Sequence, residues 1–318
     1  MPAPEPAQPV AQDFPAVVPT PLPPPLSQPQ PLPSLGWLII AGERVPVAVR
    51  VVRWNETGGF DGHTPGPEGP RFGERVISDP TLAAQVVAEG WTHERLARQV
   101  DQFVLHFDGC CTSRQCAGVL EERGLSVHFM LDVDGTIHQT LDLTARAWHA
   151  TIANDRSVGI EIANPGAHPE DHAAEFLSRY YQPTADGWPM LCPPLGPDPA
   201  WPIEFVPRPA CCGLIHGPIH AAPLAQYDYT PEQYESLARL LAALHRALPK
   251  IALAAPREAD GTPMMRQLNE KEFAEFHGML GHYHVQRNKV DPGPALQWDR
   301  VLKRAEAVDQ LMETPPAK

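Results

Sequence analysis

A set of short, strongly apolar runs constrains the fold of this chain more than any other feature of its sequence. Residues 102–107 (QFVLHF) form a compact apolar run, and a similar run lies at residues 156–164 (RSVGIEIAN). Between them, two alternating runs flank Asp134-Gly135, a dipeptide that favours the tight turn of a β-hairpin. Strands this apolar are usually covered on both faces. The pattern therefore predicts a mixed central β-sheet flanked by helices, in the α/β (α+β) class.

Helical patterns accompany these strands. Thr230, Pro231 and Gln233 provide an N-cap, a first-turn proline and a capping-box partner, and so predict the start of a helix. An apolar stripe along this helix marks its core-facing side. The stripe consists of Tyr234, Leu237, Leu241, Leu244 and Leu248. Further helices are predicted over 79–101 with a break at Gly90, over 269–280 and over 295–311, and two or three strands over 36–60.

The 39 prolines divide the chain. Residues 1–36 contain 13 of them and no Lys or Arg, which predicts an extended tether. This tether lacks the basic and apolar regions of a signal peptide, although such tethers often join a domain to an export signal or anchor. The compartment stays open, with an extracytoplasmic location favoured. We expect residues 37–100 to pack on a main domain over 101–318, which carries an irregular, proline-rich insertion at 165–229.

Charge and composition exclude several classes of function. The formal net charge is −13, and no cluster of Lys and Arg is present to bind phosphates, which argues against nucleic-acid partners and adhesion to anionic membranes. No apolar run approaches the roughly 18–20 residues that a transmembrane helix needs. The six cysteines lack the C-x-x-C spacing of a structural zinc site, and their disulfide state is left open. They are Cys110, Cys111, Cys116, Cys192, Cys211 and Cys212. The oligomeric state is not indicated.

Several polar side chains in and after the apolar runs are of the types used for proton transfer and metal binding. Alternation places Glu161 on one strand face with Gly159, where burial would raise the carboxyl pKa toward the range of a general base. His106, His128 and His282 are each, taken alone, typical of buried core histidines. Two histidines and an aspartate, however, form a catalytic zinc site with an open fourth position. The ligands of such a site would be His106, His282 and Asp291, with Glu161 as proton acceptor and Lys289 as oxyanion partner.

Several motifs together resemble a known family. They are HFDGC, DGTIHQ, RAWHA, SVGIEIAN and GHYHVQRNKVDPGP, spread over 102–164 and 229–302. The string is similar to the type-2 N-acetylmuramoyl-L-alanine amidases, zinc enzymes related to phage lysozyme-amidases and peptidoglycan recognition proteins. The resemblance implies an amidase-like fold, one catalytic Zn²⁺ and a peptidoglycan or muropeptide substrate. It also implies hydrolysis of the amide between the lactyl group of N-acetylmuramic acid and L-alanine.

The resemblance also assigns roles to particular residues. It implies His106, His282 and Asp291 as zinc ligands, Glu161 as general base and Lys289 as the group that polarises the scissile carbonyl. The residues expected to contact substrate are Trp148, His149, His128 and Asn154. His284 stands where many relatives carry an aspartate, and we expect it to compete as a ligand or to orient one.

The segment from Cys110 to Cys116 resembles the short disulfide loop of the peptidoglycan recognition proteins. Cys111 is an equal candidate as a partner in such a disulfide. Two other functions stay open from the sequence. A non-catalytic peptidoglycan-binding module is one, although such relatives typically lack a metal ligand and all three positions are filled here. A zinc peptidase that cleaves another amide of the stem peptide is the other, because its metal chemistry is identical.

Overall fold

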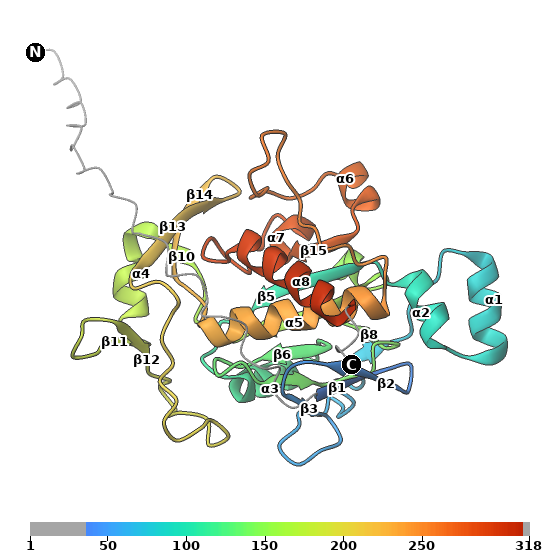
Figure 1. Cartoon of the computed structure of the whole chain (residues 1–318), viewed down its shortest axis with the longest axis horizontal. Helices are drawn as coiled ribbons and strands as arrows, with labels where there is room; N and C mark the ends of the chain where they lie inside the picture. The colour runs from blue at the N-terminus through green and yellow to red at the C-terminus, as the bar shows by residue number, and fades with distance from the viewer. Residues whose placement is uncertain (1–35, 314–318) are drawn as a thin grey trace, which may run out of the picture.

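The computed structural model describes residues 36–313 (Figure 1). Of the tether predicted over residues 1–36, residues 1–35 lie outside the described part, and Gly36 is the first residue of a strand. A mixed six-stranded sheet forms the centre, as the apolar runs predicted. Its strands, in spatial order, are β15 (Gly278–Gly281), β5 (Gln102–Phe107), β9 (Ser157–Ile162), β6 (Phe129–Leu131), β7 (Ile137–Gln139) and β3 (Val51–Arg53). The first four run parallel, β7 is antiparallel to β6, and β3 is parallel to β7.

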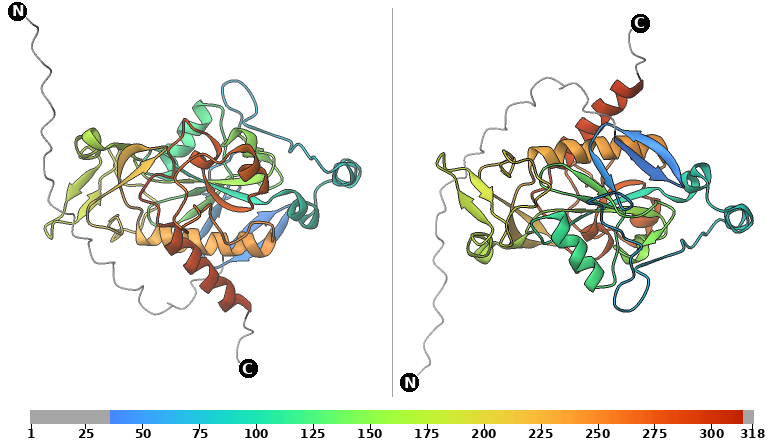
Figure 2. Two further views of the ribbon diagram at one scale, coloured as in Figure 1. Left: turned by 90° about the horizontal axis from the view of Figure 1, so that it is seen from above. Right: turned by 90° about the horizontal axis from the view of Figure 1, so that it is seen from below.

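Helices cover both faces of this sheet. Helix α5 (Pro231–Ala247) lies on one side and α3 (Ser113–Glu122) on the other, as both views in Figure 2 show. Alternation along β9 sends Val158 and Ile160 into the core shared with α5, so Gly159 and Glu161 face the α3 side. The C-terminal helix α8 (Trp298–Glu313) packs across α5 (Figure 1).

The predicted start of α5 is confirmed. Thr230 Oγ1 accepts a hydrogen bond from Gln233 N–H, and the Gln233 side chain accepts one from Thr230 N–H. Every residue of the predicted stripe is buried. The helix predicted over 269–280 is wrong at its C-terminal end, because α6 spans only Glu270–Glu275 and β15 follows. There, a Cβ on Gly278 would lie 2.7 Å from Ala254 O, so only glycine admits this close approach of the two chain segments.

The N-terminal part packs against this domain. As predicted, residues 36–60 contain strands, three in number, and the helical segment over 79–101 is divided at Gly90, whose φ is 76°. The elements are β1 (Gly36–Ile40), β2 (Glu43–Val47), β3, β4 (Phe72–Gly73), α1 (Pro80–Glu89) and α2 (His93–Gln99). Helix α1 stands apart from the sheet at one end of the molecule (Figures 1 and 2). Three further short elements are β8 (Arg146–Ala147), η1 (Thr151–Ala153) and α7 (His282–Val285).

The insertion over 165–229 differs from the irregular segment predicted. It contains β10 (His168–Pro169), α4 (Glu170–Leu177), β11 (Tyr181–Pro183), β12 (Pro189–Leu191), β13 (Leu214–Ile219) and β14 (Ala222–Tyr227). Only 192–213 form a long stretch without helix or strand. The prediction failed because prolines were taken to exclude strands, whereas Pro183, Pro189, Pro218 and Pro223 all lie at or near strand ends, where proline is tolerated.

All six cysteines are free thiols, so the loop Cys110–Cys116 is not closed by a disulfide in this structure. Across residues 36–313, no helix combines the length and the apolar character that crossing a bilayer requires.

Candidate metal centre and active-site cavity

Three neighbouring parallel strands bring the candidate residues to one edge of the sheet. His106 on β5 and Glu161 on β9 are register partners, and both side chains face the α3 side of the sheet. On the other side of β5, Gly281 ends β15 opposite Leu105, and His282 follows at once as the first residue of α7. Residues more than a hundred positions apart therefore meet because their strands end side by side.

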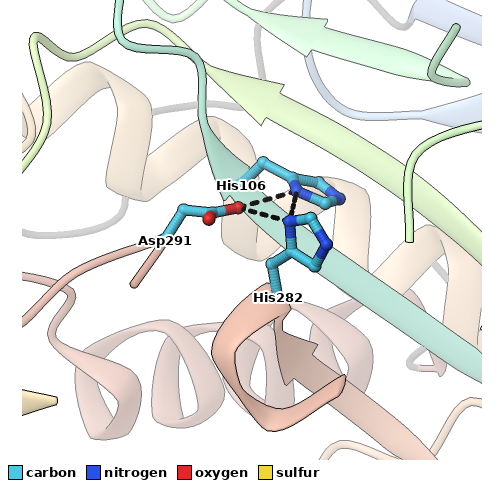
Figure 3. A group of neighbouring side chains, drawn as sticks. All are labelled: His106, His282 and Asp291. Carbon is cyan, nitrogen blue, oxygen red and sulfur yellow. Dashed lines mark hydrogen bonds and ion pairs between the residues drawn. The ribbon is translucent and has the colours of Figure 1, made fainter. Parts of the chain in front are cut away.

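His106, His282 and Asp291 point toward one another from β5, α7 and the following loop (Figure 3). Nδ1 of His106 lies 2.8 Å from Oδ2 of Asp291 and 3.0 Å from Nδ1 of His282, and the latter atom lies 2.9 Å from Asp291 Oδ2. All three residues are buried. Among the described residues, this is the one group of three or more His, Cys, Asp or Glu whose donor atoms converge in this way.

Electrostatics give His106 and Asp291 the charge states of metal ligands. Burial and the neighbouring His282 lower the pKa of His106 to about 4, which leaves its ring neutral at pH 7. Burial alone would raise the pKa of Asp291, but hydrogen bonds with His106 and His282 hold it below its usual range. A neutral His106 ring and an ionised Asp291 are therefore available at neutral pH.

The loop that carries Asp291 is held from two sides. Tyr283 N–H donates to the Asp291 carbonyl (3.2 Å), and Tyr229 Oη–H donates to the Pro292 carbonyl (2.6 Å). Gln226 on β14 donates to the same Pro292 carbonyl and accepts from Ala295 N–H. The insertion thus contributes a strand that supports the loop of the candidate ligand Asp291.

The backbone two residues after Asp291 favours glycine. Gly293 has a φ of 83°, and a Cβ there would lie 2.0 Å from Oε1 of Gln226. A side chain at this position would be strained and would displace the amide of Gln226.

A cavity of ≈ 230 Å³ opens beside the three converging side chains. Its walls include every residue predicted for catalysis or metal binding, together with Trp148 and His149. The residues of interest are His106, Trp148, His149, Glu161, His282, Lys289 and Asp291. Oε2 of Glu161 is buried and has no hydrogen-bond partner within residues 36–313. Burial and the charges of Asp291 and Asp108 raise the pKa of Glu161 well above its ordinary value.

His149 has a contact that its prediction as a groove residue did not include. Its Nδ1 lies 3.0 Å from Nε2 of His106, and its Nε2 lies 3.3 Å from Oγ of Ser157. The ring therefore lines the cavity and also contacts the face of His106 that points away from Asp291.

Asp108 also lines the cavity and was not predicted. Its Oδ1 accepts hydrogen bonds from Cys110 N–H and Asn164 N–H, whereas Oδ2 is buried without a partner in the described chain. Burial raises its pKa to about 8. The available signal was its position two residues after His106, within the HFDGC motif.

Two residues predicted to contact substrate do not line this cavity. His128 is fully buried: its Nδ1 accepts from Gly159 N–H (3.1 Å) and its Nε2 lies 3.0 Å from the Ala145 carbonyl. Asn154 Oδ1 accepts from His149 N–H and Ala150 N–H. Both side chains contact backbone groups, and Nε2 of His128 also lies 3.2 Å from Nη2 of Arg75. The structure therefore gives both residues structural contacts, and their contact with substrate stays a prediction.

His284 does not join the converging group either. Its Nδ1 accepts from Gly281 N–H (2.8 Å) and its Nε2 lies 2.7 Å from the Met264 carbonyl. Both ring nitrogens are thus engaged with backbone groups, and His284 is not one of the converging donors. The contact with Gly281 N–H lies immediately before His282 in the chain, and an orienting effect of His284 on His282 stays a prediction.

The donor set fits a zinc ion. Two imidazole nitrogens and one carboxylate oxygen are a ligand set of catalytic zinc sites, which keep a fourth position open. Donors bonded to one tetrahedral ion lie about 3.3 Å apart, so the spacings of 2.8–3.0 Å need to change only by tenths of an ångström. The unpartnered oxygen of Glu161 on the adjoining strand suits a group that acts on water at that open position.

A family model described as N-acetylmuramoyl-L-alanine amidase matches residues 96–294, more than half of the chain. A comparison with curated proteins found no match.

Solved structures give weak global similarity. The chain resembles a selenomethionine derivative of AmpD (18% identity, 80% of this chain and 93% of that chain covered, TM-score 0.35). It also resembles AmiD from E. coli (15%, 65% and 57%, TM-score 0.35) and the Drosophila peptidoglycan recognition protein SD (13%, 84% and 95%, TM-score 0.36). At these TM-scores the structures add nothing to the assignment, which rests on the family match: this chain belongs to the N-acetylmuramoyl-L-alanine amidase family.

Proposed function

We propose that this protein is a zinc-dependent amidase that hydrolyses the bond between the lactyl group of N-acetylmuramic acid and L-alanine of the stem peptide. The observation that carries the proposal is the convergence of His106, His282 and Asp291 beside Glu161 and Lys289, in one cavity of a chain of this family. A peptidoglycan amidase activity in general follows from the family. The zinc, the residue roles and the bond cleaved are the proposal.

The metal would be held by Nδ1 of His106, Nδ1 of His282 and Oδ2 of Asp291. When bound, Zn²⁺ supplies a Lewis acid that polarises a carbonyl and lowers the pKa of water. These three side chains contribute one negative charge, which leaves the site cationic and suited to a developing oxyanion.

Glu161 acts as the proton carrier. Its carboxylate removes a proton from the attacking water while the water oxygen forms a bond to the lactyl carbonyl carbon. The protonated Glu161 then donates to the amide nitrogen as the C–N bond breaks, giving a lactyl carboxylic acid and the free amine of L-alanine. Burial, Asp291 and Asp108 raise the pKa of this carboxyl group, which makes its carboxylate a stronger proton acceptor than an exposed glutamate.

Lys289 and Trp148 act on the substrate. The Lys289 ammonium lines the cavity and donates a hydrogen bond to the carbonyl oxygen as negative charge develops there. Trp148, on the same cavity, presents an indole against which the apolar face of a sugar ring can pack.

The decisive experiment is mass spectrometry of muropeptides after incubation with the full chain and Zn²⁺. An amidase releases intact stem peptides with a free L-alanine amine and leaves the lactyl carboxyl group on the sugar. Shortened stems still attached to muramic acid would instead identify a peptidase. Retention on peptidoglycan without any product would identify a binding module.

A further inference from the structure

We propose that His149 is a positioning residue that selects the ring tautomer of His106, and that Ser157 and Gly159 hold His149 in place for this purpose. The inference rests on the proposed metal site, because it concerns which nitrogen of His106 is free to bind a metal. It assigns His149 a role different from that of a wall of the substrate cavity.

Hydrogen bonding defines the tautomer. A neutral imidazole carries one N–H, and the nitrogen without it supplies the lone pair. Nδ1 of His106 faces the converging group, and Nε2 faces Nδ1 of His149 at 3.0 Å. If Nε2–H of His106 donates to His149 Nδ1, Nδ1 of His106 keeps its lone pair. His149 then carries its own proton on Nε2, which lies 3.3 Å from Oγ of Ser157.

The reverse arrangement disables the site. If Nδ1–H of His149 donated to His106, the proton of His106 would have to sit on Nδ1, between Asp291 and His282. That nitrogen could then no longer bind a metal. The Ser157 hydroxyl, which is fully buried, accepts from Nε2–H of His149 in the competent arrangement. Outer partners of metal-bound histidines commonly fix tautomer and orientation in this way.

Space for the His149 ring comes from Gly159 at the centre of β9. A Cβ at this position would lie 2.5 Å from Nδ1 and 2.6 Å from Cε1 of His149, closer than real Cβ contacts allow. The backbone of His149 is held as well, since its N–H and that of Ala150 donate to Oδ1 of Asn154. The glycine of the SVGIEIAN run and the histidine of RAWHA therefore form one packing unit behind His106.

The affinity for Zn²⁺, measured without substrate, distinguishes a His149 that positions His106 from a His149 that only lines the substrate cavity. We would measure the Zn²⁺ affinity of the full chain by competition with a chromophoric chelator, for the wild type, His149→Phe and His149→Asn. The phenyl ring removes the acceptor, so we expect a loss of about 10–100-fold. The Oδ1 of asparagine lies close to the place of Nδ1, so His149→Asn should restore most of the affinity.

Two further variants keep the test decisive if His149→Phe does not fold. Ser157→Ala removes the distant acceptor and should give a smaller loss of affinity, whereas Gly159→Ala should displace the ring and give a loss like that of His149→Phe. In the zinc-loaded wild type, ¹⁵N chemical shifts should show the His106 proton on Nε2. Circular dichroism confirms that each variant is folded.

The outcomes distinguish the two proposals. Wild-type affinity in folded His149→Phe, with a change only in KM for muropeptides, would overturn the positioning role and make His149 a wall residue. Equal losses in His149→Phe and His149→Asn would also overturn it, because the acceptor would then be irrelevant. A wild-type chain that binds no Zn²⁺ would instead refute the metal site proposed above.

Discussion

His106 and Glu161 are register partners on the adjacent parallel strands β5 and β9. Neighbouring strands are spaced about 4.8 Å apart by their backbone hydrogen bonds, so the sheet itself fixes the distance between a candidate metal ligand and the candidate general base. A site mounted on strands is held more precisely than one carried by loops. Asp291 and Lys289, by contrast, lie on a loop and depend on the side chains that support it.

Glu161→Gln should abolish most turnover while zinc binding is retained. The amide keeps the shape of the carboxylate but cannot accept a proton, and loss of a general base costs about 10²–10⁴-fold in rate. Muropeptide cleavage and zinc content would be measured on the same sample. Glu94→Gln, at an exposed glutamate of α2, is the matched control and should behave as wild type. Turnover close to wild type in Glu161→Gln would refute the mechanism.

Asp291→Ala should lower zinc occupancy rather than only the rate. The variant removes the single anionic donor and leaves two neutral nitrogens, which bind Zn²⁺ more weakly than a complete set of three protein ligands. Zinc would be measured by atomic emission after dialysis. Asp299→Ala, at an exposed aspartate of α8, is the control. Full zinc content in Asp291→Ala would show that this carboxylate is not a ligand.

Local sequence patterns predicted the elements that place the site. The apolar run at residues 102–107 correctly predicted the strand that carries His106, and the alternation along β9 correctly placed Glu161 on the face it shares with Gly159, because the two-residue period of a strand decides which side chains share a face. The capping box of α5 was equally local and is confirmed. Family motifs were needed to associate His106 with His282 and Asp291, because the sequences of β15 and β5 do not by themselves indicate that these two strands pair.

Long-range hydrogen bonds explain what the sequence did not reveal. His128 and His149 look alike in the sequence, yet one is buried against Ala145 and Gly159 and the other lines the cavity. The different surroundings of the two histidines depend on how the chain segments between the strands pack against the sheet, which the local sequence does not indicate. Gln226 is a comparable case: nothing in the proline-rich insertion indicates that this side chain holds the Pro292 carbonyl.

Gln226→Ala should reduce both stability and zinc affinity. Its fully buried amide contacts Asn164, the Pro292 carbonyl and Ala295 N–H, and removal leaves buried polar groups unpaired, at a cost of about 1–3 kcal/mol. Urea denaturation and chelator competition would measure the two effects. Gln182→Ala, at an exposed glutamine of β11 in the same insertion, should change neither. A destabilised Gln226→Ala variant with unchanged zinc affinity would show that the loop of Asp291 does not depend on this support.

Acid should destabilise the fold in part through His128. Burial lowers its pKa to about 3 in the folded state, against about 6.5 when unfolded, so the unfolded chain binds one more proton between these values. This contribution to stability is complete above pH 6.5 and is lost as pH falls toward 3, at about 1.4 kcal/mol per pH unit. The free energy of unfolding would be measured by urea denaturation at pH 6.5 and 5.0, with a chelator present to remove metal effects.

His128→Asn removes the titrating ring and should therefore lose about 2 kcal/mol less than the wild type over that interval. The oxygen of asparagine can still accept from Gly159 N–H, which limits the structural change. Other buried histidines such as His138, whose pKa is lowered to about 4, titrate in both proteins and cancel in the comparison. His172→Asn, at an exposed histidine of α4, should leave the pH dependence unchanged. Identical pH dependence in His128→Asn and the wild type would show that His128 does not titrate as its burial requires.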